Sequence, residues 1–319
     1  MLGAALPTGS AVLYKPSELT PCSGAALGEL LQEAGVPEGV FSVLQGGAEV
    51  GAPLAASGAM GVFFTGSVRA GRAVAKAAAS APNFPRLGLE LGGKDAAYVR
   101  DDVEDVAKAA AQLADGAMYN AGQSCCSVER IFVHERVFDD FVEALVAEVR
   151  GLSVGDPTDS KTYIGPMALP RQPAFIEGQL AGHKGVVRGA AVPAGAAEGA
   201  SYCSPAVVVN PPRQSSLMAD ESFGPVVAIT SVADDEAAVR AMDDSVYGLT
   251  ASVYSADQEK AESILSRLDV GSAYWNCCDR VSPRLPWSGR RASGLGATLG
   301  IDGLRAMLQP KAFHLKPSL

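Results

Sequence analysis

The sequence predicts an α/β fold. Short apolar runs alternate with segments whose apolar residues recur at helical spacing, and the first part follows the order strand, helix, strand, helix, strand, helix. Hydrophobic residues make up 48% of the 319 positions and charged residues 19%, a composition that supplies a sizeable core and is far from disordered. The length corresponds to about two domains.

The first part of the chain contains three strand and helix pairs. The expected strands are 10–14, 40–44 and 61–64, and the expected helices are 20–34, a short helix opened by Gly46-Gly47, and 71–80. Such a succession builds a parallel sheet whose ligand site lies beyond the carboxyl ends of its strands.

The second part begins near Leu91 and keeps the α/β character with a less regular alternation. Helices are expected at 103–119 and 137–149, the latter with one apolar face made of Phe138, Phe141, Val142, Leu145, Val146 and Val149. The Gly- and Ala-rich stretch 182–201 indicates a loop or a thin surface element. His134 is expected in a surface turn, and residues 311–315 can form an edge strand of the kind that often marks subunit contacts.

The charge pattern excludes several classes of protein. There are 35 acidic and 26 basic side chains, so the net charge is −9, and no Lys/Arg stripe of a nucleic-acid binder is present. The long uncharged stretch 51–68 is interrupted by Pro53 and four glycines, so no membrane span is expected. Because no basic region precedes the uncharged N-terminal stretch, we expect a soluble, cytoplasmic protein.

The six cysteines indicate free thiols in a reducing compartment. Cys125-Cys126 and Cys277-Cys278 are adjacent pairs, and no C-x-x-C spacing occurs. With three histidines in the chain, no metal site is expected.

Several separated motifs carry chemistry. They are Lys15-Pro16-Ser17-Glu18, Phe64-Thr65-Gly66-Ser67, Leu89-Glu90-Leu91-Gly92-Gly93-Lys94, Gly122-Gln123-Ser124-Cys125 and Glu221-Ser222-Phe223-Gly224-Pro225. In content and in order they resemble the aldehyde dehydrogenase superfamily, and the similarity continues through Pro286-Trp287-Ser288-Gly289 over essentially the whole chain. In one departure, Ala297 and Thr298 replace the usual Arg-Glu, which affects expectations about ion pairs and subunit contacts but not about the chemistry.

The resemblance implies a partial Rossmann-like cofactor domain and an α/β catalytic domain. Residues 1–91 correspond to the C-terminal part of the NAD-binding domain, 92–296 to the catalytic domain, and 297–319 to a C-terminal helix and oligomerisation strand. A full-length relative carries roughly the first third of its chain before the strand that ends at Lys15. We expect that portion, with its oxyanion-binding Asn and part of the aldehyde tunnel, to be absent here.

Aldehyde oxidation requires a nucleophile, a hydride acceptor and a base that activates water. In the family the nucleophile follows G-Q-x, which places it at Cys125, so the adjacent Cys126 is expected to be packed or solvent-facing. Glu90 matches the general base. The alternative for Glu90 is a solvated carboxylate at a strand end, but the flanking leucines and glycines favour partial burial and a raised pKa.

The resemblance also implies a set of cofactor-binding residues: Lys15, Glu18, Gly66, Ser67, Gly71, Leu91, Glu221 and Phe223. Lys15 and Glu18 correspond to residues that hold the adenosine ribose, and the Glu18 carboxylate would repel a 2′-phosphate, so NAD is favoured over NADP, although both kinds of relative can carry this motif. Gly66 to Gly71 resembles the helix start under the pyrophosphate. Glu221 matches the residue that grips the nicotinamide ribose, and Phe223 the one packed beside it. The alternative at each position is an ordinary loop or core residue.

Two classes of function follow. One is an NAD-dependent dehydrogenase of a small-molecule aldehyde, which as a full-length form is expected to be a homo-oligomer. The other is a truncated, inactive remnant that keeps binding or oligomerising surfaces. Acylating relatives that transfer the acyl group to coenzyme A, and acyl-phosphate reductases, have little need for a water-activating carboxylate, so Glu90 argues against them.

Overall fold

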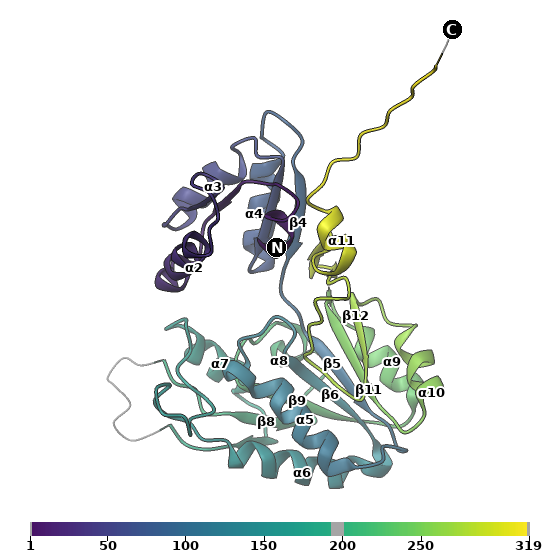
Figure 1. Cartoon of the computed structure of the whole chain (residues 1–319). Coiled ribbons are helices and arrows are strands. Elements are labelled where there is room, and N and C mark those ends of the chain that lie inside the picture. Colours follow the sequence, from purple (N-terminus) through teal and green to yellow (C-terminus); the bar gives the residue numbers. More distant parts are fainter. Residues whose placement is uncertain (1, 193–200, 318–319) are drawn as a thin grey trace.

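The computed structural model describes residues 2–192 and 201–317, which form a smaller N-terminal lobe and a larger lobe (Figure 1). The elements of the N-terminal lobe are α1 (Leu2–Ala5), β1 (Val12–Tyr14), α2 (Pro21–Glu33), β2 (Phe41–Val43), α3 (Ala48–Ala55), β3 (Gly61–Thr65), α4 (Val68–Ala78) and β4 (Arg86–Glu90). The predicted order of strands and helices is therefore confirmed. The third helix begins earlier than expected, at Val68, because the Ser67 hydroxyl caps it by accepting from the Ala70 N–H at 3.2 Å.

The strands of this lobe do not form the single parallel sheet that the sequence predicts. β1 and β2 form one parallel pair, and β3 and β4 form another, but no strand among the described residues joins β1 to β3. The alternation of strands and helices depends on the local sequence. Whether two strand pairs belong to one sheet depends instead on which strands lie between them.

The larger lobe is built on a seven-stranded sheet in the order β12-β11-β5-β6-β9-β8-β7. Its strands are parallel except for β7, which pairs antiparallel with β8. The strands are β5 (Asp95–Val99), β6 (Val128–His134), β7 (Val186–Arg188), β8 (Ala206–Val209), β9 (Val226–Val232), β11 (Thr250–Tyr254) and β12 (Ser272–Trp275). β7 lies inside the stretch 182–201 that was expected to be a loop or thin element, and residues 193–200 of that stretch are outside the described part.

Helices cover this sheet and bury its core. The longer ones are α5 (Val106–Met118), α6 (Phe138–Gly151), α7 (Gln172–Leu180), α9 (Asp235–Asp243) and α10 (Gln258–Leu265); the short elements are η1 (Tyr119–Gly122), η2 (Glu135–Val137) and α8 (Ser216–Ala219). α5 and α6 pack against each other, and α9 packs on β5 and β6. The predicted apolar face of α6 is confirmed, since Phe141, Leu145 and Val149 are buried in the core.

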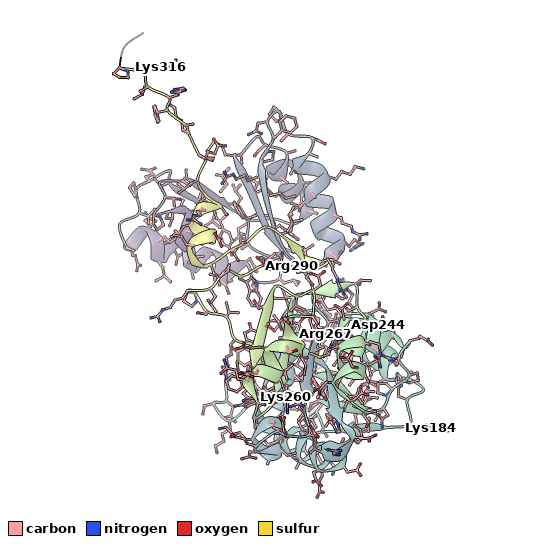
Figure 2. All side chains as sticks on the ribbon, turned by 90° about the vertical axis from the view of Figure 1, so that its right-hand side faces the viewer. Lys184, Asp244, Lys260, Arg267, Arg290 and Lys316 are labelled. Atoms are coloured by element: carbon pink, nitrogen blue, oxygen red, sulfur yellow. The ribbon has the colours of Figure 1, made fainter. Side chains whose placement is uncertain are left out.

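The chain returns to the N-terminal lobe near its end. β10 (Tyr247–Gly248) pairs with β13 (Arg290–Arg291), and β14 (Gly294–Leu295) pairs antiparallel with β4. Figure 2 places Arg290 at the junction of the two lobes. The last strand before residue 297 therefore belongs to the sheet of the first lobe, and the expected C-terminal helix is α11 (Gly300–Arg305), beside that lobe in Figure 1.

Residues 311–315 form no strand in the single chain, because the described C-terminal segment extends away from both lobes and meets no sheet edge of the same chain (Figure 1). The expected strand at a subunit contact stays a prediction. One local prediction is wrong. His134 is not in a surface turn: it ends β6 with 8% of its surface exposed, and its Nδ1 accepts from the Arg136 N–H at 3.2 Å. Among the described residues, no helix has the length and apolar character needed to cross a membrane.

Candidate active site

The candidate base Glu90 ends β4 and is 7% exposed. Its Oε1 accepts from the Thr298 hydroxyl at 3.0 Å, while Oε2 is buried without a hydrogen-bond partner in the described structure. Burial raises the pKa of Glu90 to about 7, although hydrogen bonding by Thr298 and Trp287 opposes the increase. The burial and the direction of the pKa change expected from the sequence are confirmed. A carboxyl group with a pKa near neutrality can exchange a proton with water at working pH.

The candidate nucleophile Cys125 follows α5 and the short turn η1. Asn120 and Ala121 in that turn adopt left-handed backbone angles, φ 53° and 56°, which turn the chain sharply after the helix. The Cys125 carbonyl then lies against Gly93, where an added Cβ would be 2.3 Å from the carbonyl oxygen. Gly93 is therefore required for the close approach of the segments that carry Glu90 and Cys125.

An apolar cluster joins the two candidate catalytic groups. Cys125 packs against a cluster of Cys126, Leu249 and Trp287, and Trp287 lies close enough to Glu90 to lower its pKa. Hydrogen bonding by the Cys126 thiol lowers the pKa of Cys125, whereas burial and the carboxylates of Glu90 and Glu221 act in the opposite direction. A lowered pKa increases the fraction of thiolate, the nucleophilic form.

Cys126 was expected to be packed or solvent-facing, and the structure shows that it is buried. Its thiol donates to Asp279 Oδ1 at 2.7 Å. Hydrogen bonding with Cys125, burial and the neighbouring Asp279 carboxylate raise the pKa of Cys126. Because a thiol has one proton, Asp279 competes with Cys125 for the hydrogen bond of Cys126. Cys126 is thus held as a neutral thiol beside the more acidic Cys125. All six cysteines are free.

Glu221 lies against the glycines that follow Glu90. Its Oε1 accepts from the Gly93 N–H at 3.0 Å, and a Cβ at Gly92 would be 2.5 Å from its Oε2. Burial raises the pKa of Glu221 to about 7, and the hydrogen bond from Gly93 opposes that increase. Phe223, two residues later, is half-buried and has a left-handed φ of 47°. Glu221 therefore lies beside the segment that carries Glu90, and Phe223 follows two residues later in the same loop.

The residues around the start of α4 contact Glu90 and Leu91. The Gly66 N–H donates to the Glu90 carbonyl at 3.0 Å, and a Cβ at Gly71 would be 2.5 Å from Leu91 Cδ2. Gly66 and the capping residue Ser67 are exposed at the N-terminus of the eleven-residue helix α4, which is a favourable place for an anion.

Lys15 and Glu18 follow β1, which belongs to the separate two-stranded sheet of β1 and β2. The Lys15 ammonium donates to the carbonyls of Gly46, at 2.8 Å, and Pro16, and lies 3.6 Å from the exposed Glu18 carboxylate. No hydrogen bond joins them to the other predicted site residues in the part of the chain that the structure describes.

Several groups of the site have only a weak signal in the sequence. Thr298 was assigned no chemical role, yet it donates to Glu90; its departure from the family pattern was the available signal. Asp279 was not singled out, and a charged residue in the turn after β12 is a weak signal. Glu129 was also missed, although a carboxylate inside the apolar strand β6 is unusual and calls for a partner. No cluster of His, Cys, Asp and Glu side chains suited to a metal occurs among the described residues.

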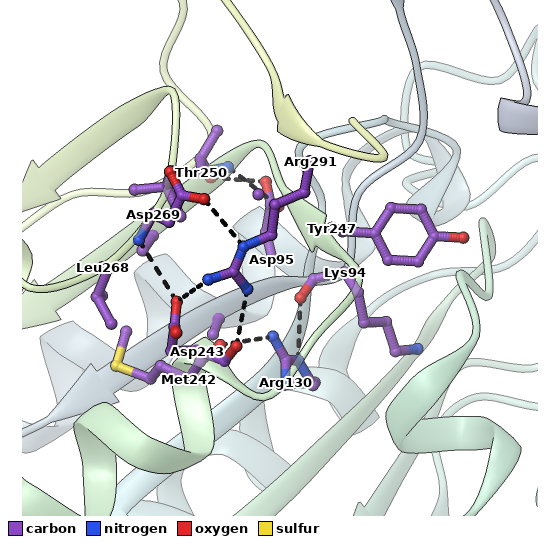
Figure 3. Close-up of a pocket in the computed structure, with 14 residues that line it drawn as sticks. Lys94, Asp95, Arg130, Met242, Asp243, Tyr247, Thr250, Leu268, Asp269 and Arg291 are labelled. Carbon is purple, nitrogen blue, oxygen red and sulfur yellow. Dashed lines mark hydrogen bonds and ion pairs between the residues drawn. The ribbon is translucent and has the colours of Figure 1, made fainter. Parts of the chain in front are cut away.

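Lys94 and Asp95, the two residues after Gly93, line a small pocket (Figure 3). There the Arg130 guanidinium donates to the Lys94 carbonyl at 3.0 Å. The Asp95 carboxylate accepts from the Thr250 N–H at 3.1 Å and from its hydroxyl at 2.6 Å. These hydrogen bonds to Lys94 and Asp95 help to hold the segment that follows Glu90 in place.

A family model described as "Aldehyde dehydrogenase family" matches residues 1–313. This chain belongs to the aldehyde dehydrogenase family. The match includes the segments that carry Glu90, Cys125 and Glu221, and confirms the family resemblance found in the sequence.

The individual proteins that the chain is similar to are also aldehyde dehydrogenases. The chain is 36% identical to the human mitochondrial aldehyde dehydrogenase over 99% of this chain and 61% of that protein, and 32% identical to a betaine aldehyde dehydrogenase of Brucella melitensis over 98% of this chain and 65% of the relative. Among solved structures, a γ-glutamyl-γ-aminobutyraldehyde dehydrogenase from Burkholderia cenocepacia superposes with a TM-score of 0.90 at 33% identity, covering 96% of this chain and 62% of that one. A Staphylococcus aureus betaine aldehyde dehydrogenase in complex with NAD+ has a TM-score of 0.89 at 31% identity, covering 95% and 61%.

These aldehyde dehydrogenases are matched by the chain over only part of their length. The chain spans between 61% and 65% of the length of the relatives just described. The fold class, an α/β aldehyde dehydrogenase fold with a mostly parallel sheet, is confirmed by the structural matches.

Proposed function

We propose that this aldehyde dehydrogenase family member oxidises a small aldehyde to a carboxylic acid, with Cys125 as nucleophile and Glu90 as base. The Cys125 thiolate adds to the aldehyde carbon to give a thiohemiacetal. Loss of hydride from that carbon leaves a thioester on Cys125. Glu90 removes a proton from water, and the resulting hydroxide attacks the thioester, releasing the acid and the Cys125 thiolate.

The proposed cofactor is NAD, which accepts the hydride when bound. Two observations of the structure fit such a group. The N-terminus of α4 presents Gly66 and Ser67 where a pyrophosphate can be held, and Glu221 stands at Gly92-Gly93, where any larger residue would occupy the space of its carboxylate. The exposed Glu18 carboxylate disfavours a 2′-phosphate, so NADP is the weaker candidate. Solved relatives that bind NAD+ support the assignment.

The observation that carries the proposal is the buried Glu90 beside Cys125. A solvated carboxylate has a pKa near 4.3 and is a weak base for water, whereas burial raises the pKa of Glu90 to about 7. This supports a hydrolytic route over transfer of the acyl group to coenzyme A or phosphate, which does not require such a base.

The test is an assay of the 319-residue chain with NAD and a panel of small aldehydes, following the formation of the reduced nicotinamide. Cys125→Ser is expected to abolish turnover, and the exposed Cys22→Ser is the matched control that retains it. Glu90→Gln is expected to leave acylation of Cys125 measurable and to slow deacylation. Turnover that survives Cys125→Ser overturns the proposal.

The inactive remnant is the other outcome of this assay. A folded chain that binds NAD, as measured by calorimetry, without turning over any aldehyde of the panel supports it. For a full-length form we propose a homo-oligomer, because Phe313 and Leu315 in the C-terminal segment are 72% and 82% exposed in the single chain. Light scattering after size-exclusion chromatography tests this proposal.

A further inference from the structure

A buried ion pair lies where three segments of the candidate active site meet. Lys94 follows Glu90 by four residues, and Glu129 follows Cys125 by four residues. The two side chains are 1% and 3% exposed, and the Lys94 ammonium donates to Glu129 Oε2. In Figure 3 the ammonium end of Lys94 points away from Arg130, whose guanidinium donates to the Lys94 carbonyl.

The third segment is the loop that carries Glu221. Glu129 Oε1 accepts from the N–H groups of Ser222 and Phe223, both at 3.0 Å, and Oε2 accepts from the Ser222 N–H at 2.8 Å. The Lys94 ammonium adds a bond of 3.0 Å to the Ser222 hydroxyl. One carboxylate thus binds two consecutive backbone N–H groups, and a charged acceptor makes such bonds stronger than neutral ones.

The bonds to Glu129 hold the loop in an uncommon conformation. Phe223 has φ 47°, which a residue with a large side chain rarely adopts, and its N–H is one of the two that Glu129 binds. The residue before the clamped pair is Glu221, whose carboxylate accepts from Gly93. Movement of the Ser222 and Phe223 amides would therefore move the Glu221 carboxylate relative to Gly92-Gly93.

Stability alone does not account for this ion pair. A buried pair of charges is often no more stabilising than two apolar side chains of similar volume, because both ions lose their hydration. Most of the hydrogen bonds that Glu129 accepts go to the Glu221 loop and not to Lys94. The arrangement is suited to setting the position of a loop.

We propose that Glu129, itself held by Lys94, is a positioning residue that places Glu221 and Phe223 for contact with the nicotinamide ribose of NAD. The inference rests on the proposed function. Glu129 takes no part in the chemistry: it acts through the loop backbone on the affinity and placement of the cofactor, and not on the reactivity of the Cys125 thiol.

The test is the variant Glu129→Gln, which keeps the shape of the side chain but presents an NH₂ group where a carboxylate oxygen stood. We expect the Kd for NAD, measured by calorimetry, to rise about tenfold to a hundredfold, as for the loss of one or two charge-assisted hydrogen bonds. The KM for NAD is expected to rise with it, while the KM for the aldehyde changes less than about twofold. Iodoacetamide should alkylate Cys125 at an unchanged rate in the absence of NAD.

Two further variants separate positioning from folding. Asp235→Asn breaks another ion pair of the same lobe, with Arg100, away from the Glu221 loop, and is the matched control expected to bind NAD normally. The double variant Lys94→Met/Glu129→Gln removes the ammonium that Glu129→Gln leaves unpaired. It is expected to recover the melting temperature of the wild type and to keep the weak affinity for NAD.

Three results overturn the inference. The first is a Glu129→Gln variant that binds NAD as the wild type does. The second is a loss of NAD affinity that is accompanied by equal changes in the KM for the aldehyde and in the alkylation rate of Cys125. A loss of NAD affinity that the double variant restores counts in the same way. Each of these outcomes indicates a general structural role for Glu129. The third is a wild-type chain that does not bind NAD, which overturns the proposed function as well, so the two failures are distinguishable.

Discussion

Thr298 is predicted to control the pH at which the proposed general base works. Its hydroxyl donates to Glu90 Oε1 at 3.0 Å and so stabilises the carboxylate form, opposing the burial that raises the pKa to about 7. Thr298→Val removes the donor and keeps the shape of the side chain. A hydrogen bond to a charged group contributes about 1.5 kcal/mol at the lower end of its range, which corresponds to about one pKa unit.

The expected result is an upward shift of the acid limb of kcat by about one pH unit. The limb reports Glu90 in the enzyme–substrate complex when hydrolysis of the thioester is the slow step. The assay is steady-state formation of the reduced nicotinamide from pH 5.5 to about 9. Thr230→Val is the matched control, because the Thr230 hydroxyl is buried in β9 and has no hydrogen-bond partner among the described residues. A limb that stays in place, or that moves to lower pH in the Thr298 variant, refutes the reasoning.

Three other predictions concern neighbouring groups. Asp279→Ala removes the carboxylate that competes for the Cys126 proton and a negative charge near Cys125, so alkylation of Cys125 by iodoacetamide at pH 7 should become roughly two- to tenfold faster; an unchanged or slower rate contradicts the competition. Because the pKa of Glu90 is raised to about 7 in the folded protein, its contribution to stability is present at low pH and is lost as the pH rises through 7. The free energy of unfolding of Glu90→Gln relative to wild type should therefore increase by about 2 kcal/mol between pH 5 and 9 in denaturant titrations, and a pH-independent difference would show that the carboxyl is not perturbed. In Gly93→Ala, the new Cβ would meet the Cys125 carbonyl at 2.3 Å, so we expect a loss of about 1–3 kcal/mol of stability together with lost turnover, whereas the open Gly178→Ala should show neither.

Much of the local structure could be predicted from the sequence because it depends on neighbours along the chain. The helix 20–34 is observed as Pro21–Glu33, ended by Ala34 before Gly35, and the apolar stripe of α6 is buried as its period requires. Helix α4 begins at Val68, earlier than the predicted start at residue 71, because the Ser67 cap extends the helix. The spacing of apolar residues alone gives no signal for such a cap.

The candidate site could be predicted where a residue and its setting are contiguous. Glu90 lies between two leucines and before two glycines, and these neighbours are enough to indicate a buried carboxyl close to another backbone. The contacts of Glu90 could not be predicted in the same way. Thr298 lies 208 positions further along the chain and reaches it because β14 pairs with β4.

The sequence by itself determined the family, the order of strands and helices, and the candidate nucleophile and base, because these are recorded in short motifs and local periodicities. Only the tertiary structure decided that β1–β2 and β3–β4 form separate sheets, that Thr298 donates to Glu90, and that Glu129 binds the Glu221 loop. The physical reason is that a pKa or a loop position depends on every charge and donor within hydrogen-bonding distance. Segments far apart in the sequence supply those groups, and folding brings them together.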